Sequence, residues 1–350
     1  NNQQTPTGNM IYYDQPGAPP EDVIGYVYNK GVNPTYTTLQ NETNGKITTN
    51  GTGSAGIYGT SNAVITNKGI VTTKETGSAG IYANSSGVTN TATGTMTVEK
   101  GSSARIYAIS NTSRETKNEG TSEGGTTSNA SETQSIGIYG KSTGGTLTLT
   151  NDKDINIHNQ KSIGIYAQKD SGSVVVNNNK NITSDPTSKE AIGIMAEGST
   201  VNNNASNGVI KLQGEKSVGI YGNTNSTIEN TGKIQLTDTS TTSKSVGILS
   251  NTGSVTNKGE IEVAGGASAG MLGLAGATIT NHSTTGKIKI TGDNSAGMYV
   301  ENSTPSNAGT INVESSKSAG IFAKITDGTS RNIENTGTIE LKAGTSTPSP

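Results

Sequence analysis

The sequence predicts an all-β parallel β-helix, or β-solenoid, of about 11 coils with 23 to 32 residues in each. Two repeated motifs alternate along the 350 residues, and the apolar residues within them recur at a spacing of two. That spacing is the period of a β-strand, and a repeat of about 20 to 50 residues is typical of solenoids. We expect a right-handed solenoid because parallel crossover connections have that hand.

The first motif contains Ser, a small or branched apolar residue, Gly, Ile or Met, and then a large residue. Ser54 to Tyr58 and Ser217 to Tyr221 are two copies. Each copy predicts one strand of a coil. The third position of the motif is occupied by Gly56, Gly80, Arg105, Gly137, Gly164, Gly193, Gly219, Gly247, Gly270, Gly297 and Gly320.

The second motif has the pattern apolar-x-Asn-x-Gly-x-Ile-x-apolar, as in Ile228 to Leu236 and Val255 to Val263. Its parity places the Asn among the inward residues, where an unpaired amide would be costly. Amides stacked at the coil repeat can bond to one another, so we expect an internal Asn ladder that sets the register. Its predicted members are Asn41, Asn67, Asn90, Asn151, Asn178, Asn203, Asn230, Asn257, Asn281, Asn307 and Asn335.

Tyrosines form a further column, which the alternation places outside or at a corner. An aromatic ladder can pack against sugars or a receptor. It can also fill a corner of the coil, and the aliphatic replacements favour that structural role. The column contains Tyr58, Tyr82, Tyr107, Tyr139, Tyr166, Tyr221 and Tyr299, with Met195, Leu249, Leu272 and Phe322 in the other coils.

The coil that follows Arg105 departs from the pattern. Residues 109–134 are almost wholly polar, and we expect them to form an insertion without a second apolar strand. Insertions in repeat proteins lie on one face, which is often where partners bind. A flexible surface loop without a partner is the alternative. Arg105 replaces a Gly, and we expect its charge to point outward beside this loop. The candidate binding residues are Arg105, Arg114, Glu123, Tyr107 and Tyr139.

The repeats predict three regions. Residues 1–36 contain Pro and Tyr but no motif, and form an irregular lead-in. Residues 37–343 form the solenoid, and residues 344–350 are a linker or the start of further repeats.

Composition argues against several function classes. The net charge is -2 with three Arg, so there is no basic field for nucleic acid. Cysteine is absent, which excludes thiolate chemistry. His158 and His282 are several coils apart, and the acidic residues are scattered. We therefore expect no catalytic site, no metal site and no cofactor.

The paired motifs carry a family resemblance. Ser318 to Phe322, followed by Asn335 to Ile339, resembles the passenger repeats of the large type V autotransporter adhesins of fusobacteria and their relatives. The resemblance covers about residues 39–342. It implies a monomeric rod on the bacterial cell surface, anchored by a C-terminal outer-membrane β-barrel outside this sequence.

The same resemblance implies attachment to host cells or to other bacteria, through a surface protein or a glycan that it does not identify. Binding residues do not transfer with the repeat motif. Two alternatives stay open. One is a β-helix enzyme acting on polysaccharides, which needs a carboxylate and a basic cluster in one groove. The other is an inert spacer with no ligand of its own.

Overall fold

The computed structural model describes residues 38–60, 62–124, 134–204, 208–283 and 285–342, and the strand β1 (Val27–Tyr28). These residues are all-β and form a parallel β-solenoid of about 11 turns, which confirms the predicted fold class. No helix among them could cross a membrane. The chain divides into two compact units, residues 1–180 and 181–350. The predicted linker at 344–350 and, apart from β1, the predicted lead-in at 1–36 lie outside the described residues.

Each coil has three strands, one from the first motif and two from the second. In one coil of the second unit these are β20 (Val218–Asn223), β21 (Ser226–Asn230) and β22 (Lys233–Leu236). The chain turns at the Asn-x-Gly step of the second motif, which lies between the end of β21 at Asn230 and the start of β22 at Lys233. The Asn230 side chain donates to the carbonyl oxygen of Gly232 at 3.2 Å and holds this corner.

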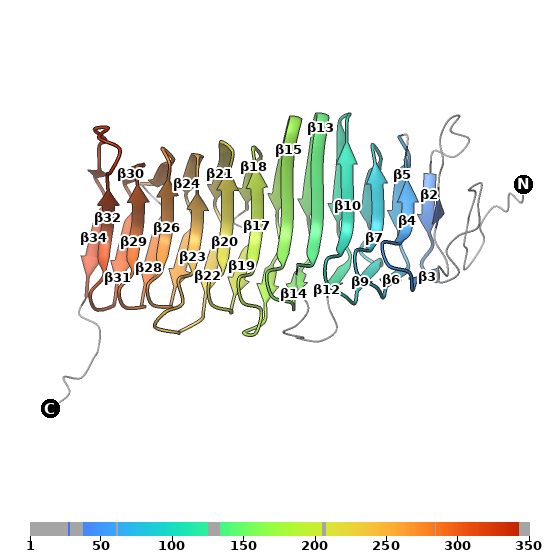
Figure 1. Cartoon of the computed structure of the whole chain (residues 1–350), viewed down its shortest axis with the longest axis horizontal. Helices are drawn as coiled ribbons and strands as arrows, with labels where there is room; N and C mark the ends of the chain where they lie inside the picture. The colour runs from blue at the N-terminus through green and yellow to red at the C-terminus, as the bar shows by residue number, and fades with distance from the viewer. Residues whose placement is uncertain are drawn as a thin grey trace, which may run out of the picture. The chain divides into compact units, whose positions relative to one another are not determined.

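In the first unit, the strands of successive coils lie side by side and pair in parallel (Figure 1). Two of its coils run the first and second strands together into single strands of 16 residues, β13 and β15. First strands are β1, β4 (Ala55–Gly59), β7 (Ala79–Asn84), β10 (Ala104–Ser110), β13 (Ile136–Asn151) and β15 (Ile163–Asn178). Second strands are β2 (Thr38–Asn41), β5 (Val64–Asn67), β8 (Gly87–Asn90) and β11 (Arg114–Asn118). Third strands are β3 (Lys46–Thr49), β6 (Ile70–Thr73), β9 (Thr95–Val98), β12 (Thr121–Gly124) and β14 (Ile155–Ile157).

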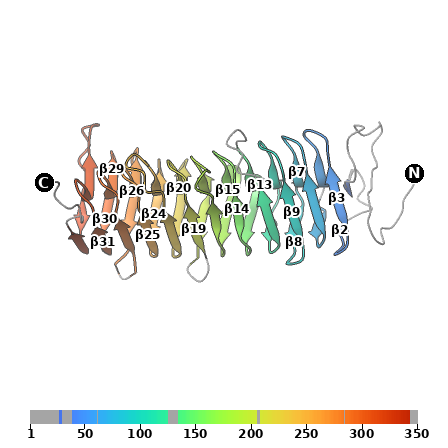
Figure 2. The ribbon, with the colours of Figure 1, turned by 90° about the horizontal axis from the view of Figure 1, so that it is seen from below.

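The second unit repeats this arrangement with more regular coils (Figure 2). First strands are β17 (Ile192–Glu197), β20, β23 (Val246–Ser250), β26 (Ala269–Leu274), β29 (Ala296–Glu301) and β32 (Ala319–Lys324). Second strands are β18 (Thr200–Asn203), β21, β24 (Gly253–Asn257), β27 (Thr278–Asn281), β30 (Thr304–Asn307) and β33 (Glu334–Asn335). Third strands are β16 (Ile182–Ser184), β19 (Val209–Leu212), β22, β25 (Glu260–Val263), β28 (Lys287–Ile290), β31 (Thr310–Val313) and β34 (Thr338–Leu341).

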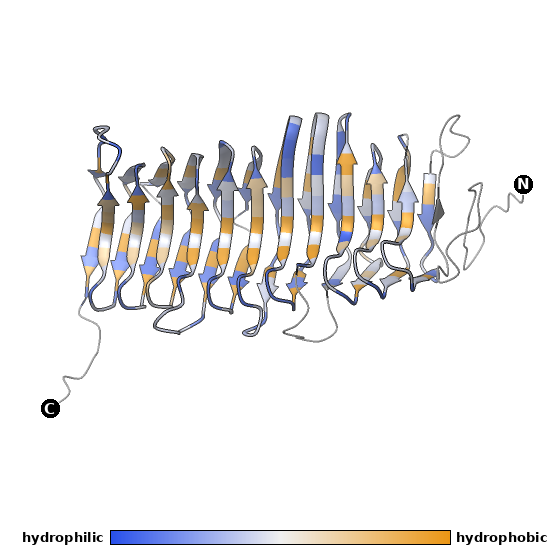
Figure 3. Ribbon diagram, viewed as in Figure 1, coloured by the Kyte–Doolittle hydropathy of each residue, from blue (hydrophilic) through white to orange (hydrophobic). Residues whose placement is uncertain are grey.

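Apolar and polar residues alternate along the strands (Figure 3). The apolar residues are the buried ones and form the interior of the coil. Ile220, Ile228 and Ile234 come from the three strands of one coil and are each at most 1% exposed. The Gly of the first motif lies against the third strand of its own coil. A β-carbon at Gly219 would lie 2.5 Å from Ile234 Cγ2 and 2.5 Å from the carbonyl oxygen of Gly247 in the next coil, so a side chain there would require both the opposing residue and the backbone to shift.

The predicted Asn ladder is confirmed within each unit. Asn230 Nδ2 donates to Asn257 Oδ1 at 2.8 Å, and Asn257 Nδ2 donates to Asn281 Oδ1 at the same distance. In the first unit the ladder has a member that the sequence analysis missed. Asn118 accepts from Asn90 at 3.0 Å and donates to Asn151 at 3.1 Å.

Asn118 belongs to the region that was expected to be a loop. Residues 114–118 and 121–124 form the strands β11 and β12, so much of the expected insertion is part of a regular coil. Thr116 and Ser122 take inward positions there and are at most 1% exposed. Polar inward residues hid these strands from a search for apolar alternation. Residues 125–133 of the expected insertion lie outside the described residues.

The ladder predicts the cost of removing one amide. Asn257→Leu removes the Asn257 acceptor of the Asn230 amide, which keeps its bond to the Gly232 carbonyl, and takes away the amide that donates to Asn281 Oδ1, so we expect the free energy of unfolding to fall by about 2 to 4 kcal/mol. Chemical denaturation of the whole chain measures this. Asn332→Leu, at an exposed position of the same unit, is the control. Equal losses in the two variants would contradict an internal ladder that stabilises the coil.

Candidate functional site

Four tyrosines of the first unit stack in a column, one from each of four successive coils. Ring centroids are 5.0 Å apart from Tyr58 to Tyr82, 5.0 Å from Tyr82 to Tyr107 and 4.5 Å from Tyr107 to Tyr139. The rings are within 21° of parallel at each step. Backbone pairing places these residues directly in register, as in Tyr82 with Tyr107. The column therefore follows from coil stacking with one residue type at one position.

The next ring is turned. Tyr166 lies 5.2 Å from Tyr139 at an interplanar angle of 77°. Tyr139 is 8% exposed, and its hydroxyl donates to Gln168 Oε1 at 2.7 Å. Burial, with the neighbouring Tyr107, raises the pKa of Tyr139 far above its usual range. Tyr139 is thus enclosed, and Tyr166 takes its place at the surface.

Beside this column lies a hollow of about 880 Å³, which we call the tyrosine groove. Tyr58, Tyr82, Tyr107 and Tyr166 line it. The small residues Ala55, Ala79 and Ala104 also line it. The remaining lining includes a column of turn residues with left-handed backbone, which precede the first strand of each coil. These are Gly53, Gly77, Ser102, Gln134 and Lys161, with φ between 54° and 71°.

The chemistry of the groove is that of apolar surface and hydroxyl groups. Among the described residues that line it, Lys161 is the one with a charged side chain. The hydroxyl of Tyr82 makes no hydrogen bond to the described residues. Partial burial, and the neighbouring Tyr107 and Tyr58, raise the pKa of Tyr82, so its phenol stays protonated at neutral pH.

Stacking decides which part of each ring is available. The faces of Tyr82 are covered by Tyr58 on one side and Tyr107 on the other. Its ring can therefore offer a ligand its edge and its hydroxyl but not its face. Aromatic edges carry partial positive charge and attract electronegative atoms.

The second unit has no equivalent run of aromatic rings among its described residues. Its column contains Met195, Tyr221, Leu249, Leu272, Tyr299 and Phe322, and one stacked pair, Tyr299 with Phe322, at 5.1 Å. The aromatic column beside a hollow is thus a feature of the first unit.

Arg105 does not point outward, and that expectation was wrong. Its side chain is 2% exposed, and its Nη2 donates to the carbonyl oxygen of Asn156 at 2.5 Å. The reason lies across the coil, where Ser122 pairs in register with Met96 and Ile155. Arg105, at a position that is usually Gly, therefore has room because Ser122 occupies a position that is usually a larger apolar residue.

Burial lowers the pKa of Arg105 to about 10, against an opposing effect of Glu123. Its Nε and Nη1 atoms are buried and have no hydrogen-bond partner in the described structure. Glu123 lies on the outer face of β12, where it accepts from Asn156 Nδ2 at 2.9 Å and lies 3.4 Å from His158 Nε2. Asn156 therefore contacts both charged groups, one through its backbone and one through its amide.

Arg114 is bound to turn residues of its own coil and of two earlier coils. Its Nε donates to the Ser85 carbonyl at 2.9 Å, its Nη1 to the Ser113 carbonyl at 2.8 Å, and its Nη2 to Asn62 Oδ1. These bonds give it a structural role within the first unit.

The five candidate residues do not gather at one place. The structure puts Tyr107 in the groove, Tyr139 behind it, Arg105 inside the coil and Glu123 on the third-strand face. A binding role for them stays a prediction. Sequence reasoning missed the groove's other lining residues, although the turn before each Ser of the first motif was visible as a column rich in Gly, Ser and Lys. The described residues contain no group of three His, Cys, Asp or Glu that could hold a metal ion.

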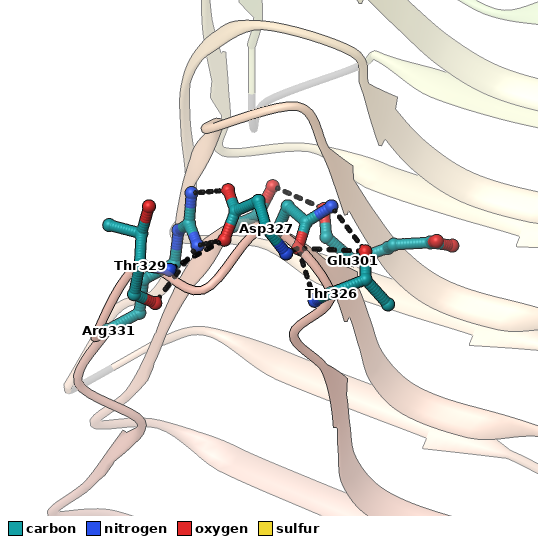
Figure 4. Close-up of polar contacts among 7 residues, drawn as sticks. Glu301, Thr326, Asp327, Thr329 and Arg331 are labelled. Carbon is teal, nitrogen blue, oxygen red and sulfur yellow. Dashed lines mark hydrogen bonds and ion pairs between the residues drawn. The ribbon is translucent and has the colours of Figure 1, made fainter.

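A loop of the second unit, residues 325–333, is ordered by polar contacts (Figure 4). Arg331 binds both carboxylate oxygens of Asp327 at 2.6 and 2.5 Å, which holds the pKa of Asp327 far below its usual range. The Thr326 backbone donates to Asn302 Oδ1 at 2.8 Å, and Lys324 pairs with Glu301 at 2.9 Å. Its charged side chains are paired with one another, which favours a structural role.

Residues 170–305 match a family model described as the BigA third pectate lyase-like domain. That description is a likeness in fold, and it agrees with the parallel β-solenoid. Searches of the curated proteins and of the solved structures found no match.

The exchange at Arg105 and Ser122 predicts strong coupling. Arg105→Gly leaves a void and Ser122→Ile overpacks the coil, so we expect each single variant to lose about 2 kcal/mol or more of unfolding free energy. The double variant restores the usual pair and should be at least as stable as the wild type, since replacing a buried charge by packed apolar groups is often neutral or stabilising. Denaturation of all four proteins gives the coupling energy. Additive losses would contradict the compensation.

We expect Glu123 to contribute to the loss of fold stability at acidic pH. Hydrogen bonds from His158 and Asn156, and the charge of Arg105, hold its pKa below the usual 4.5. A depressed folded-state pKa stabilises the fold above the unfolded-state value, and that contribution is lost as pH falls through the folded-state value. We expect the melting temperature of Glu123→Gln to fall less than that of the wild type between about pH 5 and pH 3. Glu99→Gln is the control, because Glu99 makes no ion pair within the described residues. Parallel curves for Glu123→Gln and the wild type would argue against this role.

Proposed function

We propose that this chain is a passenger segment of an autotransporter adhesin of the fusobacterial type, exposed outside the cell, and that it attaches the cell to another surface. The tyrosine groove is the observation that supports attachment best. It combines apolar surface, the hydroxyl of Tyr82 and a volume of about 880 Å³, which lies within the usual range of ligand sites. The repeat resemblance supports the surface location, and the solenoid fold agrees with a passenger.

A solenoid suits this role for a physical reason. Each coil contacts its neighbours alone, so coils can be added without building a larger globular core. The core of the first unit is made of inward columns, and the groove is built from residues outside them. Outer positions can therefore change from coil to coil while the backbone pairing stays constant. The same logic makes the segment a rigid support for a site.

We propose that the groove binds and does not catalyse. The alternative is an enzyme acting on polysaccharides, and the pectate lyase-like description of the matched family is a likeness in fold that does not decide between the two. Such an enzyme needs a carboxylate and basic groups that converge on one bond. The described residues that line the groove supply one charged side chain, Lys161, and no carboxylate. The inert-spacer alternative predicts that no change in the groove affects attachment.

An attachment assay tests the proposal. Beads coated with the whole chain should bind target epithelial or bacterial cells, and the double variant Tyr82→Leu/Tyr107→Leu should reduce bound beads by at least about tenfold. Leu occupies this column naturally at Leu249 and Leu272, so the variant should fold. Tyr299→Leu in the second unit is the matched control and should bind normally.

Two outcomes would contradict the proposal. Unchanged bead attachment in the double variant, with folding verified by circular dichroism, would favour the spacer. Release of new reducing ends or unsaturated products from a polysaccharide incubated with the chain would favour the enzyme.

A further inference from the structure

We infer that the ligand of the tyrosine groove is a neutral, extended glycan that lies along the column of coils and contacts ring edges and hydroxyls. This inference rests on the proposed attachment function and names the chemistry of its partner. Three properties of the groove lead to it: its charge, its repeat and the orientation of its rings.

The charge of the groove selects against ionic ligands. Acidic glycans and acidic peptides need several cations for recognition, commonly Arg or Lys held in a fixed geometry. Lys161 is the one charged side chain among the described lining residues, and it belongs to the column of turn residues that precede the first strands. A neutral ligand matches this surface, because it can bind without leaving a desolvated charge unpaired.

The repeat of the groove selects an extended polymer. Tyr58, Tyr82 and Tyr107 line the groove in successive coils at 5.0 Å for each step, so the same contact is offered three times along one line. A chain of equatorially linked pyranose rings presents one ring with its hydroxyls at a closely similar spacing. One sugar can therefore meet each coil. A folded protein partner needs about 800 Å² of surface on each side, whereas a groove of about 880 Å³ has the size of a site for one small or extended ligand.

Ring orientation sets the mode of contact. Because the faces of Tyr82 are covered by Tyr58 and Tyr107, sugars cannot stack on them. The positive ring edges instead face the electronegative oxygens of the sugar, and the Tyr82 hydroxyl can donate to them. The small side chains of Ala79 and Ala104 leave room for the sugar ring beside the tyrosines. The turned ring of Tyr166 exposes a different part of its surface and marks a distinct end subsite.

Calorimetric titration of the whole chain tests this inference. The neutral probes are cellohexaose and N-acetylchitohexaose, and the acidic probe is hexagalacturonate. We expect at least one neutral hexasaccharide to bind, with affinity rising with length up to about three sugar units because each coil adds a contact. Hexagalacturonate should bind at least about tenfold more weakly.

A conservative variant separates this mode of contact from general packing. Tyr82→Phe keeps the stacked ring and removes the hydroxyl, so it should weaken the neutral glycan about fivefold, as expected for one hydrogen bond. Tyr299→Phe makes the same chemical change in the second unit and should have no effect. Equal affinity of Tyr82→Phe and the wild type would overturn the proposed contact.

The results also distinguish this inference from the function on which it rests. If no neutral glycan binds, but the Tyr82→Leu/Tyr107→Leu variant still loses cell attachment, the partner is a protein and the glycan inference fails alone. Tighter binding of hexagalacturonate than of the neutral probes would likewise overturn the glycan class and leave attachment standing. If the leucine variant attaches normally, both fail.

Discussion

Parallel pairing of each strand with the same strand of the next coil is the constraint on which the rest of this structure depends. In the second unit, Ile220 pairs with Ile248, Ile228 with Val255 and Asn230 with Asn257. A register fixed in this way turns every sequence position into a column at the coil spacing of about 4.8 Å. Side chains in a column must tolerate a copy of themselves above and below. Branched aliphatics satisfy this by packing and Asn by bonding amide to amide.

The same constraint explains both the tolerance of the array and its limits. The Asn corner is kept even in the most polar coil, where Asn118 continues the ladder. Within a coil, by contrast, volume can be exchanged between facing strands, as at Arg105 and Ser122. Register between coils is therefore more strictly specified than composition within one coil. A shift of the pairing register by one residue would move every inward side chain of that strand to the outside.

Features that depend on the periodicity of residues can be predicted from the sequence. Features that depend on an exchange of side-chain size between facing strands of one coil cannot. Fold class, strand parity and all but one rung of the ladder follow from residues at a spacing of two. Asn118 was missed because Thr116 and Ser122 replace the apolar residues that mark a strand. Arg105 was placed outside because its type suggests solvent, whereas its surroundings are set by Ser122 on another strand. The sequence predicted the tyrosine column but not the hollow beside it, since the turn residues that also line the hollow belong to no apolar pattern.

Coil stacking also determines what kind of recognition the tyrosine column can perform. An isolated surface tyrosine offers a face, which suits apolar ring stacking. Rings held about 5 Å apart by the backbone cover one another's faces. The column therefore presents ring edges and hydroxyls to a partner instead of ring faces. Replacement by aliphatic residues, as in parts of the second unit, keeps the packing and removes those hydroxyls. The length of the uninterrupted aromatic run therefore sets how many contacts one extended partner can make, and this quantity can change by substitution at one position per coil without altering the fold.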